Sequence, residues 1–228
     1  MNNLLLLHGA LGVKSQFAEL EKKLSSYFNL HSINFTGHGG EPMPYEQFSI
    51  KLFANDVLDY LNSSGINKTS IFGYSMGGYV GVYVAKHFPE RVNKVFTLGT
   101  KFKWDMETAS REAKMLDPVK MKEKIPQFYD ELVKRHAPHN IEIILQKTAD
   151  MMMNLGANNE LKSEDYSTIQ HEIMVGIGDR DKMVTLEETV DVYKKLPKGS
   201  SIVLPNTPHP FEEVNSEQLE NEIKRFFG

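Results

Sequence analysis

A serine at position 75 lies in the pattern G-x-S-x-G, which spans residues 73–77. An apolar stretch from Thr69 precedes this pattern, and a helical pattern from Met76 to Phe88 follows it. A serine on a tight strand-to-helix turn needs small neighbours, and such a turn lifts the hydroxyl clear of the backbone. The first amides of the helix point at the same place and can hold an anion. We therefore predict a nucleophile elbow with Ser75 as the nucleophile; a serine that only caps the helix is the alternative.

Two later loops offer a base and an acid for this serine. A serine hydroxyl is a poor nucleophile at neutral pH and needs a base within hydrogen-bond reach, which an acid orients in turn. Asp179 and Asp181 follow one predicted strand, and His209 follows the last, between Pro208 and Pro210. The order serine, acid, histidine is the one expected of an elbow motif. We predict His209 as the base, with a loop histidine of no role as the alternative, and either aspartate as the acid.

These three groups can meet only if a parallel sheet gathers the strand ends. Uninterrupted apolar runs such as Leu4 to Leu7 are typical of strands buried on both faces. Strands and helices alternate along the chain, which predicts an α/β fold with a mostly parallel sheet of about six strands and helices on both faces. The expected strands are residues 4–7, 30–35, 69–74, 92–99, 173–177 and 201–204, and the expected helices between them are 16–27, 48–61, 76–88, 185–196 and 216–227.

The alternation stops between residues 101 and 170, where no strand is credible. This stretch is too long for a loop, and it predicts helices over residues 105–116, 118–135, 141–155 and 160–170. We interpret 101–170 as a helical cap over the strand ends, and 1–100 with 171–228 as the core domain. Its apolar residues could line a substrate cavity or pack the cap onto the core: Trp104, Met106, Met115, Phe128, Tyr129, Leu132, Ile144, Met151, Met152 and Met153.

Composition excludes several classes of function. The chain has 228 residues, a net charge of −4 and no cysteine. A nucleic-acid partner is not expected because such proteins usually carry a basic face, and no disulfide, thiol nucleophile or thiolate metal site can form. We also expect no metal and no cofactor, since His171-Glu172 lacks the second histidine of a zinc motif. No signal segment or membrane-spanning run is recognisable, so a cytoplasmic location and no membrane association are expected.

The motifs taken together resemble the α/β-hydrolase fold superfamily, in its compact branch with a helical cap. The resemblance spans nearly the whole chain and rests on residues 8–12 (HGALG), 37–39 (GHG), 73–77 (GYSMG), 178–181 (GDRD) and 207–212 (TPHPFE). Family spacing puts the acid three residues after the glycine that ends its strand, which favours Asp181 over Asp179. The resemblance also implies an oxyanion hole made by the backbone N–H groups of Ala10 and Met76, and a structural role for His8.

The resemblance further implies a serine hydrolase (an esterase) that cleaves a carboxylic ester or thioester of a small, largely apolar substrate through an acyl-enzyme. Two alternatives stay open: a cofactor-independent lyase or elimination reaction on the same triad, and a weakly catalytic or non-catalytic ligand-binding signalling module. Members of the family have two strands before the His-Gly strand, whereas this sequence starts with it. The sheet edge near the second strand is therefore expected to be exposed or covered by a second subunit, so a homodimer is one of the arrangements left open.

Overall fold

A single six-stranded parallel sheet forms the centre of the molecule in the computed structural model, which describes residues 1–228. Its strand order is β2-β1-β3-β4-β5-β6, with every neighbouring pair parallel. This confirms the predicted sheet, and β2 lies at one of its edges. The strands are β1 (Asn2–Leu7), β2 (Phe28–Ile33), β3 (Thr69–Tyr74), β4 (Val92–Leu98), β5 (Glu172–Gly178) and β6 (Gly199–Leu204).

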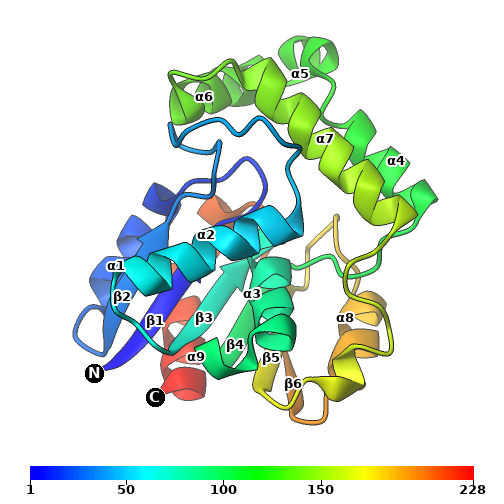
Figure 1. Cartoon of the computed structure of the whole chain (residues 1–228). Helices are drawn as coiled ribbons and strands as arrows, with labels where there is room; N and C mark the ends of the chain where they lie inside the picture. Colours follow the sequence, from blue (N-terminus) through cyan, green and yellow to red (C-terminus); the bar gives the residue numbers. More distant parts are fainter.

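Helices cover both faces of this sheet (Figure 1). One face packs against α1 (Ala18–Leu24) and α9 (Ser216–Phe227), and the other against α2 (Ile50–Ser63), α3 (Met76–His87) and α8 (Leu186–Tyr193). Strand β1 shows why the sheet needs helices on both faces. Leu4 and Leu6 lie in the hydrophobic core under α1 and α9, whereas Leu5 and Leu7 lie in the core on the opposite face. All four side chains are fully buried, as an uninterrupted apolar run in a parallel sheet requires.

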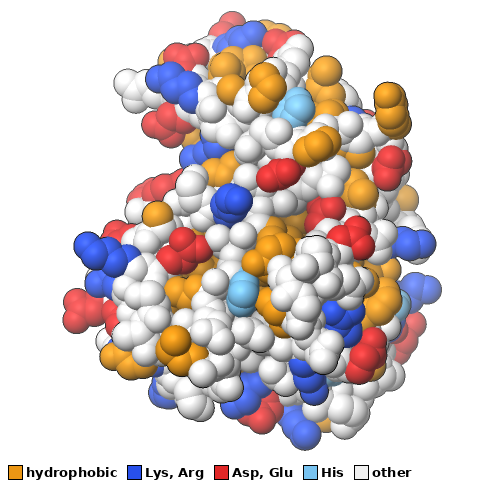
Figure 2. Space-filling view, turned by 60° about the vertical axis from the view of Figure 1, so that its left-hand side comes forward, with side chains coloured by type: hydrophobic (Ala, Val, Ile, Leu, Met, Phe, Trp, Pro, Cys, Tyr) orange, Lys and Arg blue, Asp and Glu red, His pale blue; other side chains and the backbone are white.

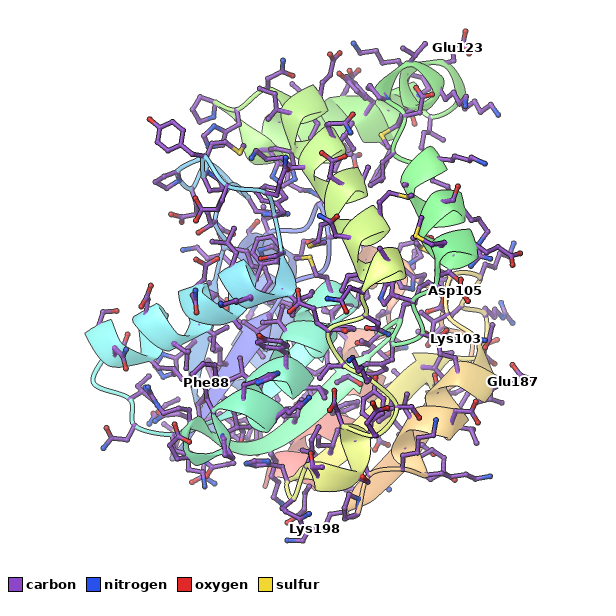
Figure 3. The ribbon with its side chains drawn as sticks, turned by 45° about the vertical axis from the view of Figure 1, so that its right-hand side comes forward. Phe88, Lys103, Asp105, Glu123, Glu187 and Lys198 are labelled. Carbon is purple, nitrogen blue, oxygen red and sulfur yellow. The ribbon has the colours of Figure 1, made fainter.

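Four helices lie between β4 and β5, beyond the carboxyl ends of the strands (Figure 1). They are α4 (Met106–Lys114), α5 (Pro118–Lys124), α6 (Pro126–His136) and α7 (Ile141–Ala157). Asp105 caps α4 by accepting the N–H of Thr108 at 2.8 Å, and Figure 3 labels it where the chain leaves the sheet for the helices. Helices α4 and α7 pack closely because Gly156 has no Cβ, which would overlap the Cβ of Ala109. The division of the chain into a core domain and a cap stays a prediction.

The predicted helix over residues 118–135 is wrong, because the structure has two helices there. Pro126 has no N–H to donate, and a residue before proline avoids helical dihedrals. Ile125 accordingly adopts φ −140° and ψ 55°, and α5 ends before it. The two helices can then point in different directions.

The predicted helix over residues 160–170 is also wrong, since only Tyr166–Thr168 form a short 3-10 turn. Side chains bind two backbone N–H groups at the start of this segment and fix a different path of the chain there. Asp165 Oδ2 accepts the N–H of Lys162 at 2.8 Å, and the Tyr79 hydroxyl accepts the N–H of Leu161 at 2.7 Å. Such bonds offer the backbone an alternative to the helix.

A cluster of buried histidines joins α6 to the loops that follow β1 and β2. His136 is fully buried; its Nδ1 accepts the N–H of Gly39, and its Nε2–H donates to the carbonyl of Leu11, both at 3.0 Å. The ring of His38 lies between His136 and His8, with ring centroids 5.6 Å and 5.3 Å away. Burial lowers the pKa of His136 to about 4 and that of His8 to about 3, so both rings are neutral at pH 7.

These lowered pKa values predict a loss of stability in acid. The unfolded chain binds protons near pH 6.5 whereas the folded chain does not, so this stability is complete above pH 6.5 and declines as the pH falls towards 4. The variant His136→Gln keeps a donor and an acceptor but cannot titrate. We expect its free energy of unfolding to depend less on pH between 4.5 and 6.5, by up to ~1.4 kcal/mol per pH unit. Urea unfolding across this range measures the slope; equal slopes in the variant and the wild type would contradict the prediction.

Candidate active site

Ser75 occupies the turn between β3 and α3 in a backbone conformation that serine rarely adopts. Its φ is +51° and its ψ −118°, and its N–H donates to the carbonyl of Leu98 at 2.8 Å. Two glycines make this turn possible. A Cβ on Gly73 would overlap the carbonyl of Gly77, and a Cβ on Gly77 would overlap the carbonyl of Leu7 in β1. The elbow geometry predicted from the sequence is therefore present.

The structure brings the predicted base and acid to this serine. His209 Nε2 lies 3.3 Å from Ser75 Oγ, and His209 Nδ1–H donates to Asp181 Oδ2 at 2.7 Å. The Tyr74 hydroxyl donates to the carbonyl of His209 at 2.6 Å, which fixes the loop after β6. The Asp181 side chain is only 1% exposed, so solvent competes little for its bond to the imidazole. The catalytic roles of the three side chains stay predictions.

The surroundings of the two candidate aspartates show which of them contacts His209. Burial raises the pKa of Asp181, but hydrogen bonds from His209 and from the N–H groups of Val184 and Met183 lower it more, so the pKa lies below its usual value. Asp179 is exposed and accepts the N–H of Thr207 at 3.1 Å, and such backbone bonds also lower its pKa. Asp181 is therefore the partner of His209, and Asp179 ties the loop after β5 to the loop after β6.

The backbone amides of Ala10 and Met76 are available beside the serine. The N–H of Ala10 donates to no group of the protein, and Met76 is the first residue of α3, where helical N–H groups have no intrahelical acceptor. Both residues line the cavity into which Ser75 opens. His8 shapes the loop: its Nδ1–H donates to the carbonyl of Gly9 at 2.8 Å, and its Nε2 accepts the N–H of Phe35 at 3.1 Å.

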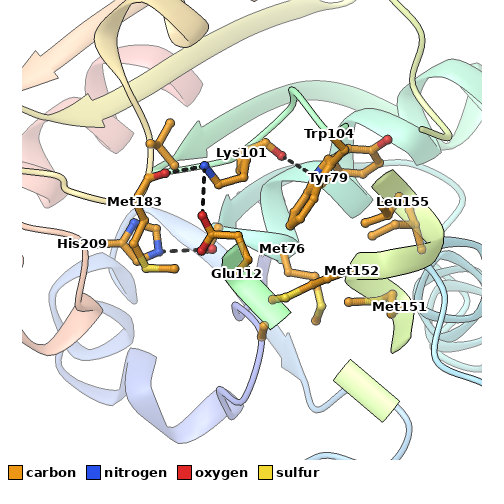
Figure 4. Close-up of a pocket in the computed structure, with 14 residues that line it drawn as sticks. Met76, Tyr79, Lys101, Trp104, Glu112, Met151, Met152, Leu155, Met183 and His209 are labelled. Carbon is orange, nitrogen blue, oxygen red and sulfur yellow. Dashed lines mark hydrogen bonds and ion pairs between the residues drawn. The ribbon is translucent and has the colours of Figure 1, made fainter. Parts of the chain in front are cut away.

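A largely apolar cavity of about 50 Å³ lies over Ser75 and His209 (Figure 4). Of the apolar residues in 101–170 that could line it, Trp104, Met151 and Met152 do so. Tyr129, Leu132 and Ile144 pack in the hydrophobic core instead. Met106, Met115 and Phe128 are exposed, and hydrophobic side chains appear among charged ones on the upper surface in Figure 2. The remaining apolar residues of the cavity wall are Ala10, Ile50, Met76, Tyr79, Leu155, Met183 and Val184.

Lys101 and Glu112 also line this cavity, and neither was predicted from the sequence. A signal for Glu112 was available. It lies three residues after the buried Ala109 in α4, so a charged side chain occupies the inward face of an amphipathic helix. Lys101 has no such signal, because it follows β4 in an irregular segment.

No group of three or more histidine, cysteine, aspartate or glutamate side chains is arranged to hold a metal ion. No helix combines the length and the apolar character that crossing a bilayer requires.

Comparison with known proteins gives partial sequence matches and complete structural matches. A 3-oxoadipate enol-lactonase of Acinetobacter baylyi is 37% identical over 67 residues, which cover 29% of this chain and 25% of the relative. This chain spans only about a quarter of the length of the curated relatives that it matches, 27% of one and 25% of another. Among solved structures, the enol-lactonase from Burkholderia xenovorans LB400 superposes with a TM-score of 0.80 at 17% identity, covering 99% of this chain and 91% of that one. An esterase from Thermogutta terrifontis superposes with a TM-score of 0.76 at 18% identity, covering 100% and 89%.

The family model described as the alpha/beta hydrolase fold matches residues 2–151, which is more than half of the chain and includes the elbow. The structural matches extend the same fold over the remainder, including β5 and β6. The chain therefore belongs to the alpha/beta hydrolase fold family.

Proposed function

We propose that this protein is a serine hydrolase that cleaves a carboxylic ester or thioester of a small, largely apolar substrate through an acyl-enzyme. The observation that carries the proposal is the hydrogen-bonded line from Ser75 through His209 to Asp181, which opens into a mostly apolar cavity. The esterase and the enol-lactonase among the structural neighbours support the choice of an ester, since a lactone is a cyclic ester.

In the first step, Ser75 Oγ attacks the ester carbonyl as His209 Nε2 takes the hydroxyl proton. The carbonyl oxygen becomes an anion, which the N–H groups of Ala10 and Met76 stabilise. Each such donor contributes about 3 kcal/mol to lowering the barrier, because it is oriented before the charge develops. His209 then gives its proton to the leaving oxygen or sulfur, and the acyl-enzyme remains.

In the second step, water attacks the acyl carbon as His209 Nε2 takes a proton from it. The bond from Ser75 Oγ to the acyl carbon then breaks, His209 returns the proton to Oγ, and the acid is released. Asp181 keeps Nδ1 of His209 protonated and stabilises the imidazolium through the 2.7 Å hydrogen bond. The amide bonds from Met183 and Val184 hold Asp181 Oδ1, so its carboxylate keeps its orientation throughout.

We propose that residues 101–170 form the cap of this site and select the acyl group. Met151 and Leu155 of α7 line the catalytic cavity and also an adjoining surface groove of about 560 Å³. Both side chains therefore lie between the apolar end of the cavity and a larger space. A cavity of about 50 Å³ suits a short acyl group while they stay in place.

The serine is tested by an activity-based probe. Ser75→Ala removes the nucleophile, so we expect it to lose labelling by a fluorophosphonate and at least about 10³-fold in turnover of p-nitrophenyl butyrate. The control Ser26→Ala, at an exposed serine, should keep both. Labelling that persists in Ser75→Ala would disprove the proposal, and labelling of the wild type without ester turnover would favour a binding module.

The choice of acid is tested by two matched substitutions. Asp181→Asn leaves the size unchanged but presents an amide to His209, which holds the imidazole in the wrong tautomer, and we expect kcat to fall by about 10³- to 10⁴-fold. Asp179→Asn should change kcat by less than about tenfold, because Asp179 accepts backbone bonds away from the imidazole. Steady-state kinetics measure both; the reverse ranking would show that the acid is wrongly assigned.

The role of Met151 in the wall between the cavity and the groove is tested by Met151→Ala. Removing this side chain joins the cavity to the groove, and we expect the ratio of kcat/KM for p-nitrophenyl octanoate to that for the acetate to rise by about tenfold or more, since each buried CH₂ contributes ~0.8 kcal/mol. Met153→Ala, on the same helix but outside the cavity wall, is the control and should leave the ratio unchanged. An unchanged ratio in Met151→Ala would contradict the proposed wall.

A further inference from the structure

The catalytic cavity contains a buried carboxylate that the mechanism above does not use. Glu112 of α4 is only 3% exposed and lines the cavity. Its Oε1 lies 3.2 Å from Arg111 Nη2 and 3.6 Å from Lys101 Nζ. Its Oε2 is buried and has no hydrogen-bond donor among the groups of the protein. Buried carboxylate oxygens rarely lack a donor, so this one requires an explanation.

Lys101 holds Glu112 in place without occupying that oxygen. The ammonium of Lys101 donates to the carbonyl of Met183 and lies 4.0 Å from Glu188 Oε2. Glu188 is in turn fixed by the N–H groups of Phe102 and Lys103, which donate to its Oε1 at 2.7 Å and 2.8 Å. The charges of this group are therefore anchored to the backbone. Glu112 lines the cavity, and its Oε2 is the acceptor of this group that no donor of the protein occupies.

The polar and apolar parts of the cavity lie at opposite ends. Figure 4 shows the charged Lys101 and Glu112 on the side of His209, whereas the apolar Met151 and Leu155 lie on the other side. In acyl transfer by a serine, the histidine protonates the leaving oxygen, so the alcohol part of an ester lies beside the histidine. The alcohol part is therefore the part of the substrate that lies on the side of Glu112.

We propose that Glu112 Oε2 accepts a hydrogen bond from a hydroxyl group on the leaving alcohol, so that the preferred substrates are esters of apolar acids with diols or other polyhydroxy alcohols. This inference rests on the proposed serine hydrolase function. A neutral donor suits the site better than a cation, because Lys101 and Arg111 already balance the charge of Glu112. A hydroxyl supplies the missing bond at the position where an alkyl group would leave the oxygen unpaired.

Two esters that differ at one atom test the proposal. Propyl butanoate and 2-hydroxyethyl butanoate have the same acyl group and alcohols of equal length, and a pH-stat follows the hydrolysis of both. We expect the wild type to prefer the hydroxyethyl ester by about tenfold in kcat/KM, as a hydrogen bond to a charged group allows. Glu112→Met should abolish this preference, and Glu112→Gln, which keeps a carbonyl acceptor, should keep part of it. Glu107→Gln, at an exposed position of the same helix, is the control and should keep all of it.

The ratio of the two esters separates this proposal from the proposed function. Equal kcat/KM values in the wild type, or the wild-type preference in Glu112→Met, would overturn the role of Glu112 while Ser75→Ala still abolished both reactions. Hydrolysis of both esters by Ser75→Ala would instead overturn the serine mechanism. If circular dichroism shows Glu112→Met to be unfolded, Glu112→Gln decides: a reduced preference supports the proposal, and an unchanged one overturns it.

Discussion

The backbone of Ser75 is the constraint on which the site depends. A serine with φ near +50° is strained by roughly 1–3 kcal/mol, and such a conformation persists only when its surroundings enforce it. Here neighbouring segments of the chain enforce this conformation by contacting the backbone of the turn directly. Gly77 sits on the carbonyl of Leu7 in β1, and the side chain of Thr100, just after β4, donates to the carbonyl of Ser75 at 2.9 Å. The two strands that flank β3 therefore hold the nucleophile, and the buried sheet supplies the stability that offsets the strain.

The base and the acid are positioned by the same kind of contact rather than by their own packing. Gly178 has no Cβ, which would overlap the carbonyl of Thr207, so the loops after β5 and β6 can approach closely. Asp179 then bonds the N–H of Thr207 and joins the two loops. Asp181 and His209 lie on these loops, so their 2.7 Å bond follows from the backbone around it. The geometry of the site thus depends on the carboxyl ends of β3, β5 and β6, with β4 lying between β3 and β5.

The sequence predicted those parts of the molecule that local rules decide. An apolar run such as Leu4–Leu7 is stable inside a sheet that is covered on both faces. A serine with a glycine two residues before it and another two residues after it fits a tight turn between a strand and a helix. Two kinds of feature escaped. The break at Pro126 follows a local rule that the helical periodicity of the region hid, whereas residues 160–170 lost their helix to bonds made by distant groups, including the hydroxyl of Tyr79. Glu112 had a signal in the sequence, a charge on the inward face of an amphipathic helix, but the groups that surround it are known only from the structure.

The order of the strands also bears on how the chain acquires its activity during synthesis. Ser75 follows β3, one of the first four strands, which are contiguous in the sheet, whereas His209 follows β6, the strand at the far edge. A ribosome delivers residue 209 only after the four helices beyond β4 have emerged, so the turn that carries Ser75 is synthesised long before the histidine beside it. A chain that lacks β6 and the loop after it also lacks His209, so Ser75 then has no imidazole within reach. The contact between Ser75 and His209 therefore forms only when the last strand has joined the sheet.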